Sequence, residues 1–203
     1  MCYHYKPPSD GIKIKRRFAA ILQVPLGEYQ MTNGYSYPEM PVILDTAASE
    51  VRLAKWGLLP FFAKDDKEFL KKSNTLNAKI ETAETLASYR NYVDNRCLVL
   101  ADSFKEWKHE TINGKLIKTP YEIRTKDALP FAFAGLYSVW NGITTFTILT
   151  TQANELMAEI HNSAKRMPVV LCPSEEKLWL SREPLKPYCN RSEVALIATP
   201  IVN

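Results

Sequence analysis

A cysteine directly after the first methionine is the residue of this chain with the most unusual chemistry. If Met1 is removed, Cys2 carries both a free α-amine and a thiol. Their reference pKa values are about 7.7–8 and about 8.5, so a useful fraction of each is unprotonated near neutral pH. Such a 1,2-aminothiol condenses with an aldehyde through its amine and then closes a thiazolidine ring through its sulfur. The position of Cys2 alone is weak evidence for such a reactive role, because most cysteines are small buried residues or incidental ones.

Three other polar side chains stand at the ends of expected elements, where they could support such a reaction. Glu106 precedes Trp107, and a carboxyl beside an apolar ring can act as a general acid or base; an ordinary exposed glutamate is the plain alternative. His161 is expected at the end of a short helix, whose dipole favours the protonated ring, although a capping histidine is common there. Asn77 could orient a nucleophile through its amide, but a turn or N-cap role fits equally well.

Basic residues slightly exceed acidic ones, with 26 Lys and Arg against 22 Asp and Glu, which gives a net charge of +4. Lys13, Arg16 and Arg17 fall in one short stretch. Such a stretch fits either a solvated basic surface or a face that follows nucleic-acid phosphates. Trp56 and Trp107 could stack on bases, although packing in the core is the more frequent role of tryptophan.

The composition is that of an ordinary globular protein, with 46% apolar and 24% charged residues in a chain of 203. This length predicts one domain, residues 1–203, and nothing requires more than a monomer. No segment is apolar enough for a membrane span, and no signal peptide is visible at the start. The four scattered cysteines form no C-x-x-C pair, so we expect no metal, no cofactor, no disulfide framework and a cytoplasmic location.

Strand signals outnumber helix signals. β-compatible patterns occupy residues 12–24, 41–46, 51–56, 97–103 and 169–171. Asn113-Gly114 and Asn141-Gly142 each separate two extended runs and predict β-hairpins. Because hairpins imply antiparallel pairing, we expect an α+β domain with a curved antiparallel sheet or barrel and peripheral helices.

Three helices are expected around that sheet. The spacing of apolar residues predicts one over residues 82–94 and a short amphipathic one over residues 154–160, with Thr151 or Ala153 near its start. The third opens at Pro173, with Ser174 as its cap.

Short motifs follow one another from Cys2 to about Trp179. In order they are Met-Cys at the start, WGLLP, N-A-K-x-E-T, C-L-V-L-A-D-x-F-x-E-W, AGLYSVW, TILTTQAN and I-H…R-M-P-V. This ordered series resembles the SOS response-associated peptidase (SRAP) family, which includes abasic-site shielding proteins. Chance would not produce the whole set in sequence.

The resemblance implies a function and a set of site residues. The catalytic cysteine of the family falls on Cys2, the asparagine that positions it on Asn77, and its active-site glutamate and histidine on Glu106 and His161. The family binds single-stranded DNA, links covalently to abasic sites through a thiazolidine and removes its own Met1. Its fold is a β-rich α+β domain.

The chain departs from the family pattern at three places. The usual Met-Cys-Gly-Arg start is here followed by Tyr3 and His4, so His4 replaces an arginine that commonly contacts DNA phosphate. The usual N-A-R triplet ends in Lys79, which keeps the charge but loses bidentate geometry. Residues 162–165 lengthen the gap before Arg166. These changes concern DNA affinity and leave the Cys, Asn, Glu and His set intact.

Together these observations predict an abasic-site sensor that crosslinks to single-stranded DNA through Cys2, as an autoproteolytic, lyase-type protein associated with the nucleoid when DNA is bound. The expected DNA-binding residues are His4, Arg16, Arg17, Trp56, Lys79, Trp107 and Arg166. Two alternatives stay open. Cys2 could act as a thiol nucleophile on other peptides with His161 as base, or the chain could hold single-stranded DNA without covalent chemistry.

Overall fold

The computed structural model describes residues 2–23, 25 and 27–202. Its strands are β1 His4–Lys6, β2 Ile21–Leu22, β3 Thr32–Asn33, β4 Glu39–Leu44, β5 Glu50–Trp56, β6 Asn77–Lys79, β7 Arg96–Ala101, β8 Ser103–Ile112, β9 Lys115–Thr125, β10 Phe131–Trp140, β11 Ile143–Gln152, β12 Arg166–Pro168, β13 Val170–Leu171 and β14 Leu196–Pro200. The α-helices are α1 Gly11–Phe18, α2 Asp66–Lys72, α3 Glu155–Ile160 and α4 Pro173–Leu180.

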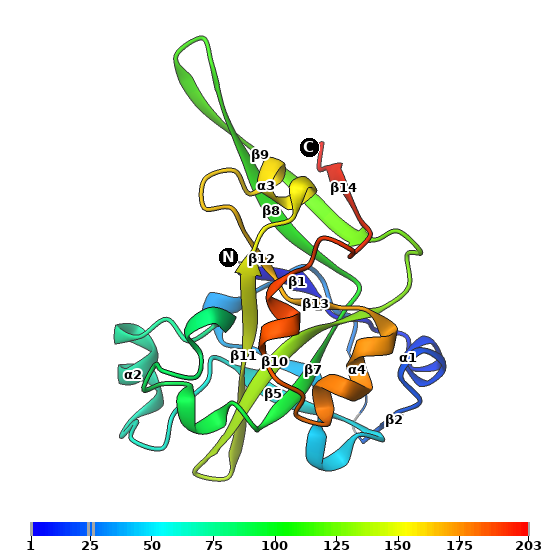
Figure 1. Cartoon of the computed structure of the whole chain (residues 1–203), viewed down its shortest axis with the longest axis vertical. Helices are drawn as coiled ribbons and strands as arrows, with labels where there is room; N and C mark the ends of the chain where they lie inside the picture. The colour runs from blue at the N-terminus through cyan, green and yellow to red at the C-terminus, as the bar shows by residue number, and fades with distance from the viewer. Residues whose placement is uncertain (1, 24, 26, 203) are drawn as a thin grey trace.

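A small barrel forms the body of the molecule. Its strands follow the order β11-β10-β7-β4-β5, each antiparallel to the next, and β11 then closes the circle by pairing parallel with β5. A second, antiparallel sheet has the order β14-β9-β8-β1-β3. The long β8–β9 hairpin of this sheet projects away from the barrel (Figure 1). The architecture confirms the expected β-rich α+β fold.

Both faces of the barrel wall are buried, which explains its nearly continuous apolar strands. Every residue of β7 is buried. Cys97 and Val99 belong to one apolar cluster, which also holds Trp56, whereas Leu98 and Leu100 belong to a second cluster. Since successive side chains of a strand point to opposite faces, one cluster fills the inside of the barrel and the other lies under the peripheral helices.

Two tight turns connect the longest strands, as the sequence predicts. Asn113 and Gly114 have φ values of 51° and 74°, and Asn141 and Gly142 have 49° and 79°. Two successive residues with positive φ form the turn whose twist matches a hairpin, and Asn-Gly tolerates it best. The registers Ile112↔Lys115 and Trp140↔Ile143 place both turns at the predicted positions.

The β-pattern expected over residues 12–24 is wrong for most of its length. Gly11–Phe18 forms α1, because the Asp10 side chain accepts hydrogen bonds from the backbone N–H groups of Ile12 and Lys13 and caps the helix. Basic residues in its last turn further stabilise the helix, because they interact favourably with the negative end of its dipole. Among the described residues of this range, Ile21–Leu22 alone form a strand, and residue 24 lies outside the described residues.

The helix expected over residues 82–94 is also wrong. The segment forms turns and two short 3₁₀ helices, Ile80–Thr82 and Arg90–Tyr92. Two tertiary hydrogen bonds hold it: Tyr89 donates to the carbonyl of Asn77, and Tyr92 accepts from the backbone N–H of Phe61. These tyrosine contacts, which local spacing does not reveal, replace the helical register.

The other two helix predictions hold. Asn154 caps α3, directly after Ala153, which was expected near its start. Cys172, in place of the expected Ser174, stands at the N-cap position of α4. Helix α2 was not predicted, although Asp65 accepts a hydrogen bond from the N–H of Glu68 as an ordinary N-cap. Among the helices of the described residues, none is long and apolar enough to cross a membrane.

We predict that Gly135→Ala destabilises the barrel. Gly135 lies on β10, and an added Cβ would stand 2.7 Å from Cys97 Sγ, 2.8 Å from Val99 Cγ2 and 3.1 Å from the backbone oxygen of Thr147. Overpacking of this kind costs about 1–3 kcal/mol, measurable by urea denaturation. The matched control is Gly27→Ala, which meets nothing within 4 Å and should change stability little. Equal stability of the two variants would contradict this packing.

Candidate active site

Cys2 lies at the buried end of the N-terminal strand. β1 pairs with β8 through Tyr5↔Phe104 and with β3 through His4↔Asn33, which places the preceding residues against the barrel. Cys2 is 0% exposed and belongs to the apolar cluster inside the fold. Its Sγ donates a weak hydrogen bond to the carbonyl of His4 at 3.7 Å.

Asn77 holds Cys2 from the side of the barrel. It begins β6, which pairs parallel with β11, and it is buried. Its Nδ2 donates a hydrogen bond of 2.8 Å to the carbonyl oxygen of Cys2. The backbone oxygen of Asn77 in turn accepts from Tyr89 at 3.2 Å. A buried amide fixed at its backbone can therefore keep Cys2 in one position.

Glu106 and His161 form a buried pair next to this cysteine. Glu106 comes from β8 and His161 is the residue that ends α3, and their exposures are 3% and 8%. His161 Nε2 lies 3.9 Å from Glu106 Oε2. His161 Nδ1 lies 2.7 Å from the carbonyl oxygen of Arg166. Since a carbonyl only accepts, Nδ1 carries the hydrogen, and Nε2 faces the carboxyl group.

Burial sets the protonation of all three groups. It raises the pKa of Glu106 to about 7 and lowers the pKa of His161 below its ordinary value. The expectation that the helix dipole favours protonated His161 is therefore wrong, because desolvation outweighs it. Burial, with the nearby Glu106 carboxyl, also raises the pKa of the Cys2 thiol. The Cys2 thiol in this geometry is therefore protonated near neutral pH, where the sequence led us to expect a useful fraction of thiolate. The sulfur needs a base to react.

A cavity of about 450 Å³ opens over this pair. All three histidines of the chain, His4, His109 and His161, line it. Its remaining lining residues are Tyr3, Tyr35, Glu106, Trp107, Lys118 and Ser163. The histidines come from three different elements, so only the folded chain brings them together. Glu106, His161 and an aromatic surface therefore share one space, whereas Cys2 and Asn77 are buried behind its lining.

Two of the expected DNA-binding residues lie in this cavity. His4 meets the ring of Trp107 edge-on, with centroids 5.1 Å apart. The ammonium of Lys105 stands 5.1 Å from the centroid of the same ring. A third, Lys79, is exposed at the end of β6, the strand that Asn77 begins.

The other four expected DNA-binding residues are occupied or lie elsewhere. Trp56 is 0% exposed and donates to the carbonyl of Leu76, so its ring is not accessible to a base. Arg166 makes two hydrogen bonds of 2.8 Å to Glu81, an ion pair that competes with phosphate binding.

Arg16 and Arg17 belong to α1 and line a different cavity, next to Leu129 and Pro130. Arg17 also forms a bidentate pair with Glu176, at 2.9 and 2.6 Å. This largely shielded pair occupies Arg17, whereas Lys13 and Arg16 are exposed.

The sequence interpretation missed Lys118, Tyr35 and Ser163. Lys118 could have been found, because the Asn113-Gly114 turn fixes a register that sets Lys118 opposite His109. Tyr35 lies in the short 3₁₀ helix Gly34–Ser36 and Ser163 in a turn, and no sequence pattern places either of them near Cys2. Within residues 2–23, 25 and 27–202, no three His, Cys, Asp or Glu side chains gather as a metal site would require.

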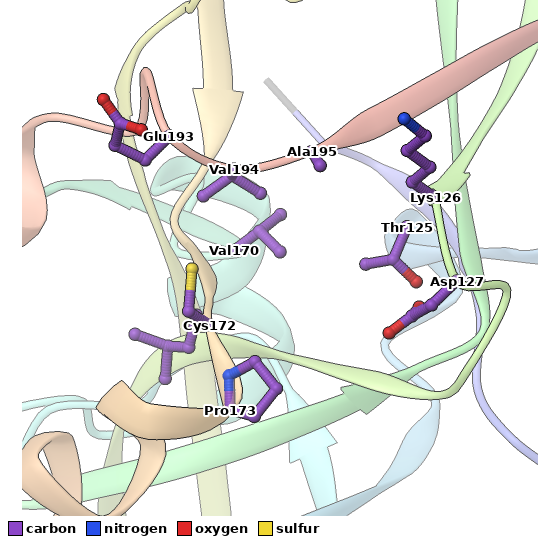
Figure 2. A pocket seen from close by; sticks show the side chains of 10 residues that line it. Thr125, Lys126, Asp127, Val170, Cys172, Pro173, Glu193, Val194 and Ala195 are labelled. Carbon is purple, nitrogen blue, oxygen red and sulfur yellow. The ribbon is translucent and has the colours of Figure 1, made fainter.

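A second hollow, of about 250 Å³, lies apart from this site. Figure 2 shows Cys172 and Pro173 facing Thr125 and Asp127 across it. Burial raises the pKa of the Cys172 thiol. None of the four candidate catalytic residues lines this hollow, whereas Glu106 and His161 line the cavity of about 450 Å³.

Comparisons with known proteins agree with this geometry. A family model described as "SOS response associated peptidase (SRAP)" matches residues 1–198. The chain is 38% identical over 189 residues to "Abasic site processing protein YoqW" of Bacillus subtilis, covering 89% of this chain and 80% of that protein. It is 40% identical over 171 residues to "Abasic site processing protein YoaM" of the same organism, covering 80% and 71%.

Solved structures share the fold. A crystal structure of a protein from Bacteroides thetaiotaomicron superposes with a TM-score of 0.84 and 30% sequence identity, over 100% of this chain and 93% of that one. A second, from Bordetella bronchiseptica, has a TM-score of 0.79 at 24% identity.

We predict that Glu106→Gln stabilises the protein increasingly as the pH rises. The Glu106 carboxyl ionises from about pH 4.5 in the unfolded chain but only near pH 7 when folded. The native state therefore binds the extra proton in this window, and wild-type stability falls as pH rises through it. Glutamine has no such cost, so its advantage should grow to about 3 kcal/mol by pH 8. Thermal unfolding between pH 4.5 and 8 measures it, and a pH-independent difference would contradict the burial effect.

Proposed function

The chain belongs to the SOS response-associated peptidase (SRAP) family, and from that premise we propose that it processes abasic sites in single-stranded DNA. The Bacillus subtilis relatives are described as abasic site processing proteins, and this chain covers most of their length. We propose further that it does so as a covalent partner of the DNA, through the amine and thiol of Cys2.

The observation that carries the proposal is the hydrogen bond from Asn77 to the Cys2 carbonyl beside a buried acid–base pair. Asn77 fixes where the N-terminal residue lies. Glu106, with a pKa of about 7, can both give and accept a proton at neutral pH. His161 presents Nε2 to the same place.

Removal of Met1 comes first in this proposal. Hydrolysis of the Met1–Cys2 amide consumes one water, releases methionine and frees the α-amine of Cys2. The carbonyl of that amide belongs to Met1, whereas Asn77 binds the carbonyl of Cys2 itself. Asn77 therefore acts as a positioning residue, and its hydrogen bond persists after the cleavage.

The crosslink then forms in balanced steps. His161 assists opening of the abasic sugar by proton transfer at the ring oxygen, which exposes the aldehyde at C1′. The Cys2 amine adds to C1′, and protonation of the resulting hydroxyl by Glu106 releases water and leaves an iminium ion. The Cys2 sulfur adds to the same carbon, and its proton returns to Glu106. The net reaction joins aldehyde and aminothiol into a thiazolidine with loss of one water.

The cavity walls suit a single strand. Lys118 supplies positive charge and Trp107 a flat apolar ring in the cavity, and the ammonium of Lys105 stands 5.1 Å from the centroid of that ring. A sugar must enter this cavity to reach the groups beside Cys2, and an unpaired nucleotide does so without first leaving a duplex. Exposed Lys79 is a further phosphate contact in this proposal.

A denaturing gel tests the covalent chemistry. Wild-type protein mixed with single-stranded abasic DNA should give a band that survives heat and detergent. Cys2→Ser or an N-terminal tag that blocks processing should abolish it, whereas Cys189→Ser, which changes a partly exposed thiol, should not. Absence of the wild-type band contradicts the proposal. A shift on native gels alone would favour the non-covalent binding module, and turnover of unrelated peptides would favour the general peptidase.

We predict that Lys118→Ala weakens DNA binding without preventing crosslinking at saturating DNA. Removal of one phosphate contact should lower affinity across sequences and reduce the slope of log K against log salt by about 1. Fluorescence anisotropy at several salt concentrations measures both. Lys126→Ala is the matched control, because Lys126 lines the second hollow (Figure 2). Equal slopes for the two variants would remove Lys118 from the DNA interface.

A further inference from the structure

Two tyrosines form the wall of the cavity next to Cys2. Tyr3 and Tyr35 both line it, and their ring centroids lie 4.9 Å apart with a tilt of 32°. Tyr35 is 51% exposed. An exposed aromatic pair at the rim of a cavity is a surface that a flat apolar group can cover.

Hydrogen bonds hold this pair in place. Asn74 Nδ2 donates to the hydroxyl oxygens of Tyr3 and Tyr35, at 3.0 and 3.4 Å. The backbone N–H of Gly34 donates to the carbonyl of Tyr3 at 2.8 Å, and the Asn33 side chain accepts from the N–H of Tyr35. Because the rings are fixed before anything binds, a partner loses little affinity in ordering them.

The two sides of the cavity differ in charge. Lys118 and His109 lie opposite each other on the β8–β9 hairpin, whereas the wall made by the two tyrosines presents neutral phenols. Burial further raises the pKa of Tyr3, so its phenol stays neutral. The hairpin side therefore suits phosphates, and the tyrosine side suits an uncharged ring.

We propose that Tyr3 and Tyr35 form a stacking shelf for the nucleobase next to the abasic site. The inference rests on the proposed function and deepens it, since it assigns a base-binding subsite to the same cavity. An abasic nucleotide has no base of its own, so its neighbour in the strand offers the nearest flat ring. Stacking is tolerant of sequence, because every base presents a π face. Tyr3 replaces the glycine usual in the family, so the shelf is a property of this chain.

Tyr35 is the better residue to change, because Tyr3 adjoins Cys2 and its backbone belongs to the site. Tyr35→Leu removes the ring but keeps an apolar side chain, and Tyr35→Phe keeps the ring. Each variant is tested with single-stranded DNA that carries a tetrahydrofuran abasic analogue, which binds but cannot crosslink. The base on the 5′ side or the 3′ side of the analogue is then either thymine or a second tetrahydrofuran.

We expect wild-type protein to lose about tenfold in affinity when the base on one side is absent. With the base present, Tyr35→Leu should bind about tenfold more weakly than wild type does. Removal of that base should not weaken the binding of Tyr35→Leu any further. Tyr35→Phe should bind within about twofold of wild type, because stacking needs the ring and not the hydroxyl. Thermal unfolding of each variant checks that it is folded.

Two results would overturn the shelf. One is wild-type affinity that does not depend on either neighbouring base, a result that needs no variant. The other is a loss in Tyr35→Leu that is equal with and without that base. Both leave the proposed function standing if the wild-type protein still crosslinks through Cys2 to natural abasic DNA. Loss of that crosslink would instead refute the function itself.

Discussion

One hydrogen bond, from Asn77 Nδ2 to the carbonyl oxygen of Cys2, joins the barrel to the N-terminal segment. Its two ends come from different sheets, since Asn77 begins β6 beside β11, and Cys2 precedes β1, which pairs with β8 and β3. The register of β1 is equally constrained. A slip by one residue would exchange the buried face of Tyr5 for that of His4 and displace Cys2. The position of the proposed nucleophile is thus a consequence of how both sheets assemble.

Burial around that bond has opposite consequences for the groups it encloses. It keeps the Cys2 thiol protonated and protects it, while it moves the pKa of Glu106 toward neutrality, where a proton shuttle is most useful. Ionisation of the Glu106 carboxyl in this buried position costs folding free energy. The site therefore loses stability to gain a tuned acid, a compromise common where buried groups do chemistry. Glu106 lines the same cavity as Trp107 and Lys118, which belong to the surface proposed to meet DNA.

Much of the fold follows from local sequence. The Asn-Gly turns at 113–114 and 141–142 fix two hairpins, and their φ values bear this out. Elsewhere, hydrogen bonds of single side chains override the pattern of apolar residues. Tyr89 and Tyr92 hold the segment after β6 in turns, and the cap provided by Asp10 converts an apparent strand into α1. Neither effect is visible from periodicity alone.

The candidate site also has a part that the sequence predicts and a part that depends on the assembled fold. Motif resemblance singled out Cys2, Asn77, Glu106 and His161. The fold joins Cys2 to Asn77 by a hydrogen bond and pairs Glu106 with His161 at the wall of one cavity. Surface roles were harder to predict, because exposure and ion pairing depend on the assembled structure. Trp56 is enclosed by the barrel, and Arg166 is paired with Glu81. Tyr35 joins the cavity through a turn and an asparagine contact that no spacing rule contains.

The central claim is that the amine and the sulfur of one residue both bond to the same carbon of an abasic site. Intact mass spectrometry of the protein, alone and after mixing with abasic single-stranded DNA, tests it most directly. We predict a protein that lacks Met1 and an adduct equal in mass to protein plus DNA minus one water. Borohydride should leave that mass unchanged, because a closed thiazolidine has no imine to reduce. An adduct on protein that retains Met1, or one that gains two hydrogens with borohydride, would contradict the claim.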